Sequence, residues 1–141
     1  MNNLKILFVC TGNTCRSPMA QAMASQLFEG FEVASAGVMA MDGQAASVNA
    51  VAAMNQRELD IIKHKAQILS EELITWADLV FTMTTSHKHA IGESDKVYTL
   101  GEYAGCGTSI SDPFGGSLDD YLSCAEEIYN LLTKIKAKLE R

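Results

Sequence analysis

The sequence has no long apolar run and no excess of positive charge. No apolar stretch approaches the roughly 18 residues that a membrane-spanning helix needs, so we expect no membrane partner. The chain has 11 Lys and Arg residues against 17 Asp and Glu residues, and its net charge of -6 argues against general nucleic-acid binding. The first residues also lack the pattern of a secretory signal. We therefore expect a cytoplasmic protein.

The sequence also lacks a metal-binding pattern. It has no Cys-x2-Cys pair, and Cys106 and Cys124 lie far from each other in the chain, so we expect no structural zinc and interpret both as buried or incidental thiols. His87 and His89 have no acidic or thiol ligands nearby, and we expect them at a solvated helix start. The sequence thus predicts no metal and no other cofactor.

The length and pattern of the chain predict one α/β domain. Its 141 residues, 48% of them hydrophobic, suit a single globular domain over residues 1–141. Strand-like runs alternate with helical patterns, which implies an open, parallel four-stranded sheet with helices on both faces. We expect strands at residues 4–9, 31–36, 79–83 and 97–100, and helices at 18–28, 46–56, 71–76 and 118–139. The Gly- and Ser-rich segment 101–116 is expected to be a functional loop.

The segment Cys10-Thr-Gly-Asn-Thr-Cys-Arg-Ser17 connects the first strand to the first helix. We expect Ser17 to be the N-cap of that helix, with Pro18 at the first helical position. A loop of this length turns successive backbone N–H groups inward beside the helix amino end, which makes a cradle for a phosphoryl group. We expect the phosphate to be bound by Thr11, Gly12, Asn13, Thr14, Cys15, Arg16 and Ser17.

Individual residues of this loop suit phosphate chemistry. Gly12 and Asn13 tolerate the positive φ that a tight curl requires. The planar fork of Arg16 matches two phosphoryl oxygens. Thiols beside a cation and a helix amino end ionise at lower pH than free cysteine, so we expect Cys10 to be a thiolate at neutral pH. Ser17 Oγ is close enough in sequence to donate a hydrogen bond to that sulfur.

The pattern Cys-x5-Arg-Ser, followed far downstream by Asp112-Pro113, resembles the low-molecular-weight protein tyrosine phosphatase family. Further matches occur in family order over essentially the whole chain, at Ser35-Ala36-Gly37, His64-Lys65-Ala66-Gln67 and Ala77-Asp78-Leu79-Val80. The resemblance implies activity on phosphorylated proteins through a phosphocysteine intermediate. It assigns in-line attack to Cys10, and it assigns to Asp112 the protonation of the leaving group and later the activation of water. Asn13, Ser17, Ser35 and His64 are then the residues that hold the loop in shape.

The residues around the loop favour one phosphorylated side chain over another. Tyrosine-specific relatives carry a bulky aliphatic residue after the nucleophile and aromatic residues on the rim, but this chain has Thr11, and residues 38–46 include no aromatic residue. Phe114 is followed by two glycines where a second tyrosine often occurs. These features resemble the bacterial protein arginine phosphatase branch. We therefore predict phosphoarginine as the favoured substrate, phosphotyrosine as the alternative, and Thr11 and Phe114 as specificity residues.

The residues present disfavour two further functions and suggest one regulatory role. Arsenate reductases of the same fold need two more cysteines after the third strand, and residues 82–89 contain none. A catalytically inactive phosphate-binding module would need neither Cys10 nor Asp112. A curled loop would bring Cys15 near Cys10, so a sulfenic acid at Cys10 could condense into a reversible disulfide, a hypothesis of redox protection. The sequence leaves the oligomeric state open.

Overall fold

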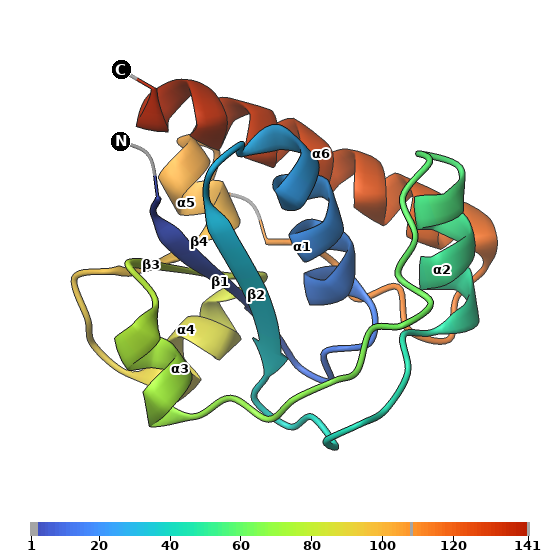
Figure 1. Ribbon diagram of the computed structural model, residues 1–141, viewed down its shortest axis with the longest axis horizontal. Helices are drawn as coiled ribbons and strands as arrows, with labels where there is room; N and C mark the ends of the chain where they lie inside the picture. Colours follow the sequence, from blue (N-terminus) through green and yellow to red (C-terminus); the bar gives the residue numbers. More distant parts are fainter. Residues whose placement is uncertain (1–2, 108, 141) are drawn as a thin grey trace.

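A four-stranded parallel sheet forms the centre of the computed structural model, which describes residues 3–107 and 109–140 (Figure 1). Its strands are β1 (Lys5–Cys10), β2 (Glu32–Gly37), β3 (Leu79–Thr82) and β4 (Val97–Thr99). They lie in the order β2-β1-β3-β4, and every neighbouring pair is parallel. The predicted open parallel sheet is confirmed, and β1 occupies an inner position in it.

Helices cover both faces of the sheet. They are α1 (Arg16–Leu27), α2 (Val48–Asn55), α3 (Glu71–Trp76), α4 (Thr85–Ile91), α5 (Leu100–Ala104) and α6 (Leu118–Leu139). Helices α1, α5 and α6 lie against one face with α2 beside them, and α3 and α4 lie against the other (Figure 1). Among the described residues, no helix has both the length and the apolar character that crossing a bilayer demands.

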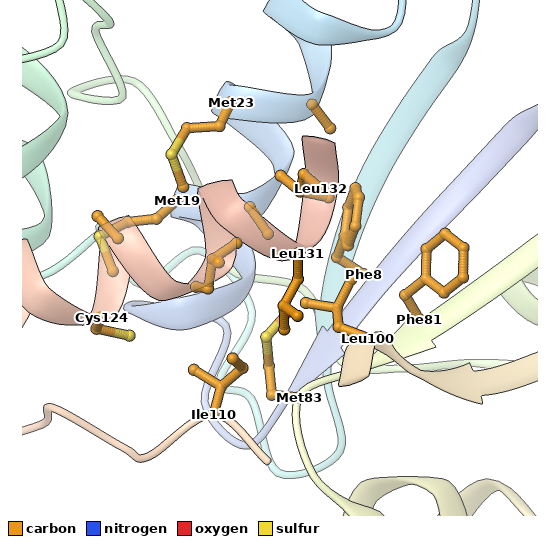
Figure 2. Close-up of a cluster of buried hydrophobic side chains, with 14 of the residues drawn as sticks. Phe8, Met19, Met23, Phe81, Met83, Leu100, Ile110, Cys124, Leu131 and Leu132 are labelled. Carbon is orange, nitrogen blue, oxygen red and sulfur yellow. The ribbon is translucent and has the colours of Figure 1, made fainter. Parts of the chain in front are cut away.

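The strand β1 supplies side chains to two separate hydrophobic clusters. Because successive side chains of a strand point to opposite faces, Ile6 and Phe8 join the larger cluster, and Leu7 and Val9 join the smaller one. Figure 2 shows part of the larger cluster, where side chains of α1 and α6 pack near the aromatic rings of Phe8 on β1 and Phe81 on β3. A strand buried on both faces holds its carboxyl end in a fixed position, and the residue at that end is Cys10.

Two helical features differ from the sequence prediction. Residues 101–104 of the expected loop 101–116 belong to α5, which begins at Leu100, the last residue of the expected strand 97–100. The helix forms because Thr99 Oγ accepts the Glu102 N–H while the Glu102 carboxylate accepts the Thr99 N–H. Position 108 of that loop lies outside the described residues. Helix α1 begins at Arg16 with Cys15 as its N-cap, so the N-cap prediction for Ser17 is wrong. The Ser17 hydroxyl is instead hydrogen-bonded to Cys10 and Asn13.

Replacing Leu132 with alanine is expected to lower the free energy of unfolding by about 2–5 kcal/mol, because the side chain is fully buried and leaves a cavity. Urea denaturation followed by circular dichroism measures the change. The exposed Asn130→Ala on the same helix is the control, with an expected change within about 0.5 kcal/mol. Equal effects of the two substitutions would contradict the placement of the core.

Candidate active site

The loop between β1 and α1, residues 10–17, has its carbonyl groups turned outward; we call it the phosphate loop. Three of these oxygens accept backbone hydrogen bonds from the chain that follows β2: Cys10 O from Val38, Thr11 O from Met39 and Thr14 O from Ser47, at 2.9–3.0 Å. The C=O and N–H groups of a trans peptide point in opposite directions. The N–H groups in the same peptide planes, those of Thr11, Gly12 and Cys15, therefore face the interior of the loop, where they can bind an anion.

Asn13 stabilises the curved conformation of the phosphate loop through hydrogen bonds on the side away from the cavity. It has a left-handed φ of 57°, and its side-chain amide donates to Ser17 Oγ at 2.8 Å and to Ser35 Oγ at 3.0 Å. Its Oδ1 atom accepts the Gln67 N–H at 3.0 Å, and His64 Nε2 lies 2.7 Å from its backbone oxygen. The structure thus brings together all the residues expected to support the loop, and it adds Gln67 to them.

One glycine within the phosphate loop differs from the prediction, and a second glycine beside the loop has a role that was not predicted. Gly12 does not adopt a positive φ, so the curl depends on Asn13 alone of the two residues named for it. Gly37, the last residue of β2, lies within the Ser35-Ala36-Gly37 family match, but no role was predicted for it. A Cβ atom there would lie 2.5 Å from Thr11 O and 2.9 Å from Asn13 N. The close approach of β2 to the phosphate loop therefore requires glycine at this position.

Cys10 lies at the floor of the loop, with its Sγ atom 2.8 Å from Ser17 Oγ. Asn13 donates a hydrogen bond to the same Ser17 oxygen, so the Ser17 proton is free to be donated to the sulfur. A hydroxyl that donates to sulfur stabilises negative charge there. The hydrogen bond expected between Ser17 and Cys10 is present, and the ionised state of Cys10 stays a prediction.

The guanidinium of Arg16 connects the phosphate loop to the segment that carries Asp112. Its Nη1 atom donates to Ile110 O at 2.8 Å, and its Nη2 atom lies 3.5 Å from both Asp112 Oδ2 and Thr11 Oγ1. The Arg16 side chain is 4% exposed, and its Nε–H group has no hydrogen-bond partner among the described residues. A buried, unpaired donor of this kind is costly unless it meets an anion.

A cavity of about 260 Å³ opens above the sulfur. Its lining residues are Cys10, Thr11, Gly12, Thr14, Cys15, Arg16, Gln44, Asp112 and Phe114. Asn13 and Ser17, also expected to bind phosphate, are fully buried behind it. The half-exposed Asp112 accepts the Phe114 N–H at 3.1 Å, and Phe114, which also lines the cavity, is 73% exposed. Nucleophile, cation, carboxylate and apolar rim thus surround one space.

The Cys15 sulfur contacts groups other than Cys10. Its Sγ atom lies 3.3 Å from the hydroxyl of the buried Tyr121 and 3.6 Å from Ser47 Oγ. All four cysteines are free, and the reversible disulfide between Cys10 and Cys15 stays a prediction. Cys124 is buried and Cys106 is exposed. The burial raises the pKa of Cys124 to about 12.

The expectation that His87 is solvated is wrong. Its side chain is buried on α4, and its Nε2 atom lies 2.9 Å from Thr11 Oγ1. Burial, and then the charge of Arg16, lower the pKa of His87 to about 4. His89 is exposed, as expected. The spacing Thr84-x-x-His87, which caps α4, was the available sequence signal for this placement.

The chain resembles protein phosphatases along nearly its whole length. The family model described as low molecular weight phosphotyrosine protein phosphatase matches residues 5–141. A protein-arginine-phosphatase of Geobacillus stearothermophilus is 41% identical over 96% of each chain. The low molecular weight protein-tyrosine-phosphatase PtpB of Staphylococcus epidermidis is 40% identical, over 97% of this chain and 100% of PtpB. The solved structure of YwlE arginine phosphatase, with a phosphorylated active-site serine in place of cysteine, has a TM-score of 0.93 at 40% identity, over 98% of this chain and 97% of that one.

Replacing Gly37 with alanine is expected to lower kcat/KM by ~10²-fold, because the added Cβ displaces the phosphate loop and misplacement of reacting groups by about 1 Å has effects of that size. Steady-state phosphatase assays measure the loss. Gly12→Ala is the comparison, since a Cβ there meets its nearest atom, Thr14 Oγ1, at an ordinary 3.7 Å. A smaller loss for Gly37→Ala than for Gly12→Ala would contradict this account.

Proposed function

This chain belongs to the low-molecular-weight phosphotyrosine protein phosphatase family, and we propose that it hydrolyses phosphoarginine side chains of proteins in preference to phosphotyrosine. Membership makes it a cysteine-dependent protein phosphatase. The observation that carries the substrate preference is the Thr11 hydroxyl, which lies directly after the nucleophile and lines the cavity. Four free cysteines fit a reducing compartment, and this supports the expected cytoplasmic location.

In the first step, Cys10 Sγ attacks phosphorus and the phosphorus–nitrogen bond breaks. The electron pair of that bond passes to the guanidine nitrogen, which takes a proton from Asp112. Arg16 and the inward N–H groups of the phosphate loop bind the nonbridging oxygens, where negative charge gathers. The phosphorylated serine in the YwlE relative supports a covalent intermediate on the residue at this place.

In the second step, the Asp112 carboxylate takes a proton from water as the water oxygen attacks phosphorus. The sulfur–phosphorus bond breaks, and its electron pair returns to Cys10 Sγ. The Ser17 hydroxyl, 2.8 Å from that sulfur, stabilises the departing thiolate. Inorganic phosphate leaves, and Asp112 is protonated again for the next cycle.

The cavity suits a guanidinium better than a phenyl ring. Beside Thr11, the polar side chain of Gln44 lines it, and Phe114 is its only aromatic lining residue within the described part of the chain. The exposed Met39 and Met41 follow β2, in the segment where no aromatic residue occurs. A phenyl ring would therefore lack a second aromatic face, whereas the N–H groups of a guanidinium meet oxygen atoms.

Phosphotyrosine hydrolysis is the second candidate function. The exposed ring of Phe114 at the mouth favours it, since one face of a substrate ring can stack there. PtpB, which is 40% identical to this chain, is named a protein-tyrosine-phosphatase. The two functions share every step of the chemistry except the leaving atom, which is oxygen in phosphotyrosine.

Replacing Asp112 with asparagine is expected to slow substrates with poor leaving groups by about 10²- to 10⁴-fold, because proton donation is lost. Substrates with good leaving groups need less protonation and should slow less. Values of kcat/KM for phenyl phosphate and 4-nitrophenyl phosphate measure the difference. Equal slowing of both would refute proton donation by Asp112.

The substrate proposal is tested by hydrolysis of phosphoarginine and phosphotyrosine in the same peptide, with arsenate reduction assayed in parallel. We expect a higher kcat/KM for phosphoarginine and no arsenate reduction. Thr11→Ile should lower the ratio of the two values by roughly tenfold, since one polar contact is exchanged for an apolar one. Cys10→Ser is the control and should abolish both hydrolytic activities. A ratio that Thr11→Ile leaves unchanged, or a preference for phosphotyrosine in the unmodified enzyme, would overturn the proposal.

A further inference from the structure

His87 is the one buried histidine of the described residues that touches a side chain of the cavity wall. It comes from α4, far along the chain from the phosphate loop, and its Nε2 atom lies 2.9 Å from Thr11 Oγ1. Its other ring nitrogen faces the start of its own helix, where Thr84 N lies 3.2 Å from His87 Nδ1. The ring therefore bridges a fixed backbone group and the residue on which the proposed substrate preference rests.

These contacts determine which ring nitrogen carries the proton. The Thr84 backbone N–H can only donate, so Nδ1 is the acceptor. Burial, followed by the charge of Arg16, lowers the pKa of His87 to about 4, so the ring is neutral at neutral pH. In a neutral imidazole only one nitrogen bears hydrogen. His87 Nε2 is consequently the donor, and Thr11 Oγ1 is the acceptor.

The bond from His87 limits what the Thr11 hydroxyl can offer to a ligand. A hydroxyl has one proton and two lone pairs, and His87 occupies one of those lone pairs. Arg16 Nη2, at 3.5 Å, is also a donor, so the Thr11 proton is directed at neither residue. When Arg16 binds phosphoryl oxygens, the second lone pair of Thr11 is free for an N–H group of the substrate.

We propose that His87 is a positioning residue that fixes the Thr11 hydroxyl, so that its proton faces a phosphoryl oxygen and its free lone pair accepts an N–H of the phosphorylated guanidinium. This inference rests on the proposed preference for phosphoarginine, and it adds His87 to Thr11 as a residue that determines this preference. Phosphotyrosine has no N–H group beside its phosphorus. A Thr11 hydroxyl with a fixed orientation therefore discriminates between the two substrates. A freely rotating hydroxyl would discriminate less, because its lone pair would not be held toward the substrate N–H.

The test compares kcat/KM for phosphoarginine and phosphotyrosine in three variants. His87→Phe keeps a ring but removes the donor, and it should lower the phosphoarginine-to-phosphotyrosine ratio by about two- to tenfold, the effect of one hydrogen bond. His87→Gln retains an amide N–H and should restore part of the ratio. His89→Gln, at an exposed position on the same helix, is the matched control and should leave the ratio unchanged.

A double substitution separates positioning from general structure. In the Thr11→Val background the hydroxyl is absent, so adding His87→Phe should leave the ratio within about twofold of Thr11→Val alone. The proposal is overturned if His87→Phe alone leaves the ratio unchanged, or if it lowers the ratio equally with and without the Thr11 hydroxyl. A preference for phosphotyrosine in the unmodified enzyme would overturn the substrate proposal alone, because the dependence of the ratio on His87 through Thr11 is still measured.

The unmodified protein supplies an independent measurement should the variants fold poorly. Nitrogen-15 NMR of the imidazole rings at pH 7 should show His87 protonated at Nε2 and unprotonated at Nδ1. The opposite tautomer, or a charged ring at that pH, would overturn the proposal.

Discussion

The outward anchoring of the phosphate loop is the constraint on which the site depends. A loop whose N–H groups converge on one point leaves several donors without protein partners, an arrangement that is unfavourable by itself. It persists because the loop carbonyls accept hydrogen bonds from the chain after β2, and because Asn13 binds Ser17, Ser35 and Gln67 at once. These hydrogen bonds thus supply the free energy that keeps the anion site open around Cys10.

Arg16 connects this anion site to the acid. The same guanidinium binds Ile110 O on the segment that carries Asp112 and holds an unpaired Nε–H for phosphate. Its 3.5 Å approach to Asp112 sets the carboxylate over the cavity while leaving it half exposed to water. A lysine has one ammonium group in place of the forked guanidinium, so it would bind either the segment that carries Asp112 or the phosphate, but not both. Binding and proton transfer are therefore coupled through one side chain.

The local parts of the site could be predicted from the sequence, and the long-range parts could not. Cys10, Arg16 and Ser17 follow from one strand-loop-helix segment, and the sheet follows from alternating patterns. Gly37 and His87 reach the loop only because β2 and β3 flank β1, a neighbour relation that the sequence did not specify residue by residue. The N-cap prediction for Ser17 failed for a related reason, since its hydroxyl is engaged by Asn13 and Cys10.

The frame of the phosphate loop is held through main-chain atoms, including Thr11 O, and through buried side chains, whereas the side chains of Thr11, Gln44 and Phe114 line the cavity without anchoring the loop. We therefore expect substitutions of these three side chains to leave the catalytic groups in place. The side chains that contact the leaving group can therefore change during evolution while the nucleophile Cys10 and the acid Asp112 are retained. A single scaffold can in this way give rise to enzymes that cleave phosphorus from nitrogen and enzymes that cleave it from oxygen.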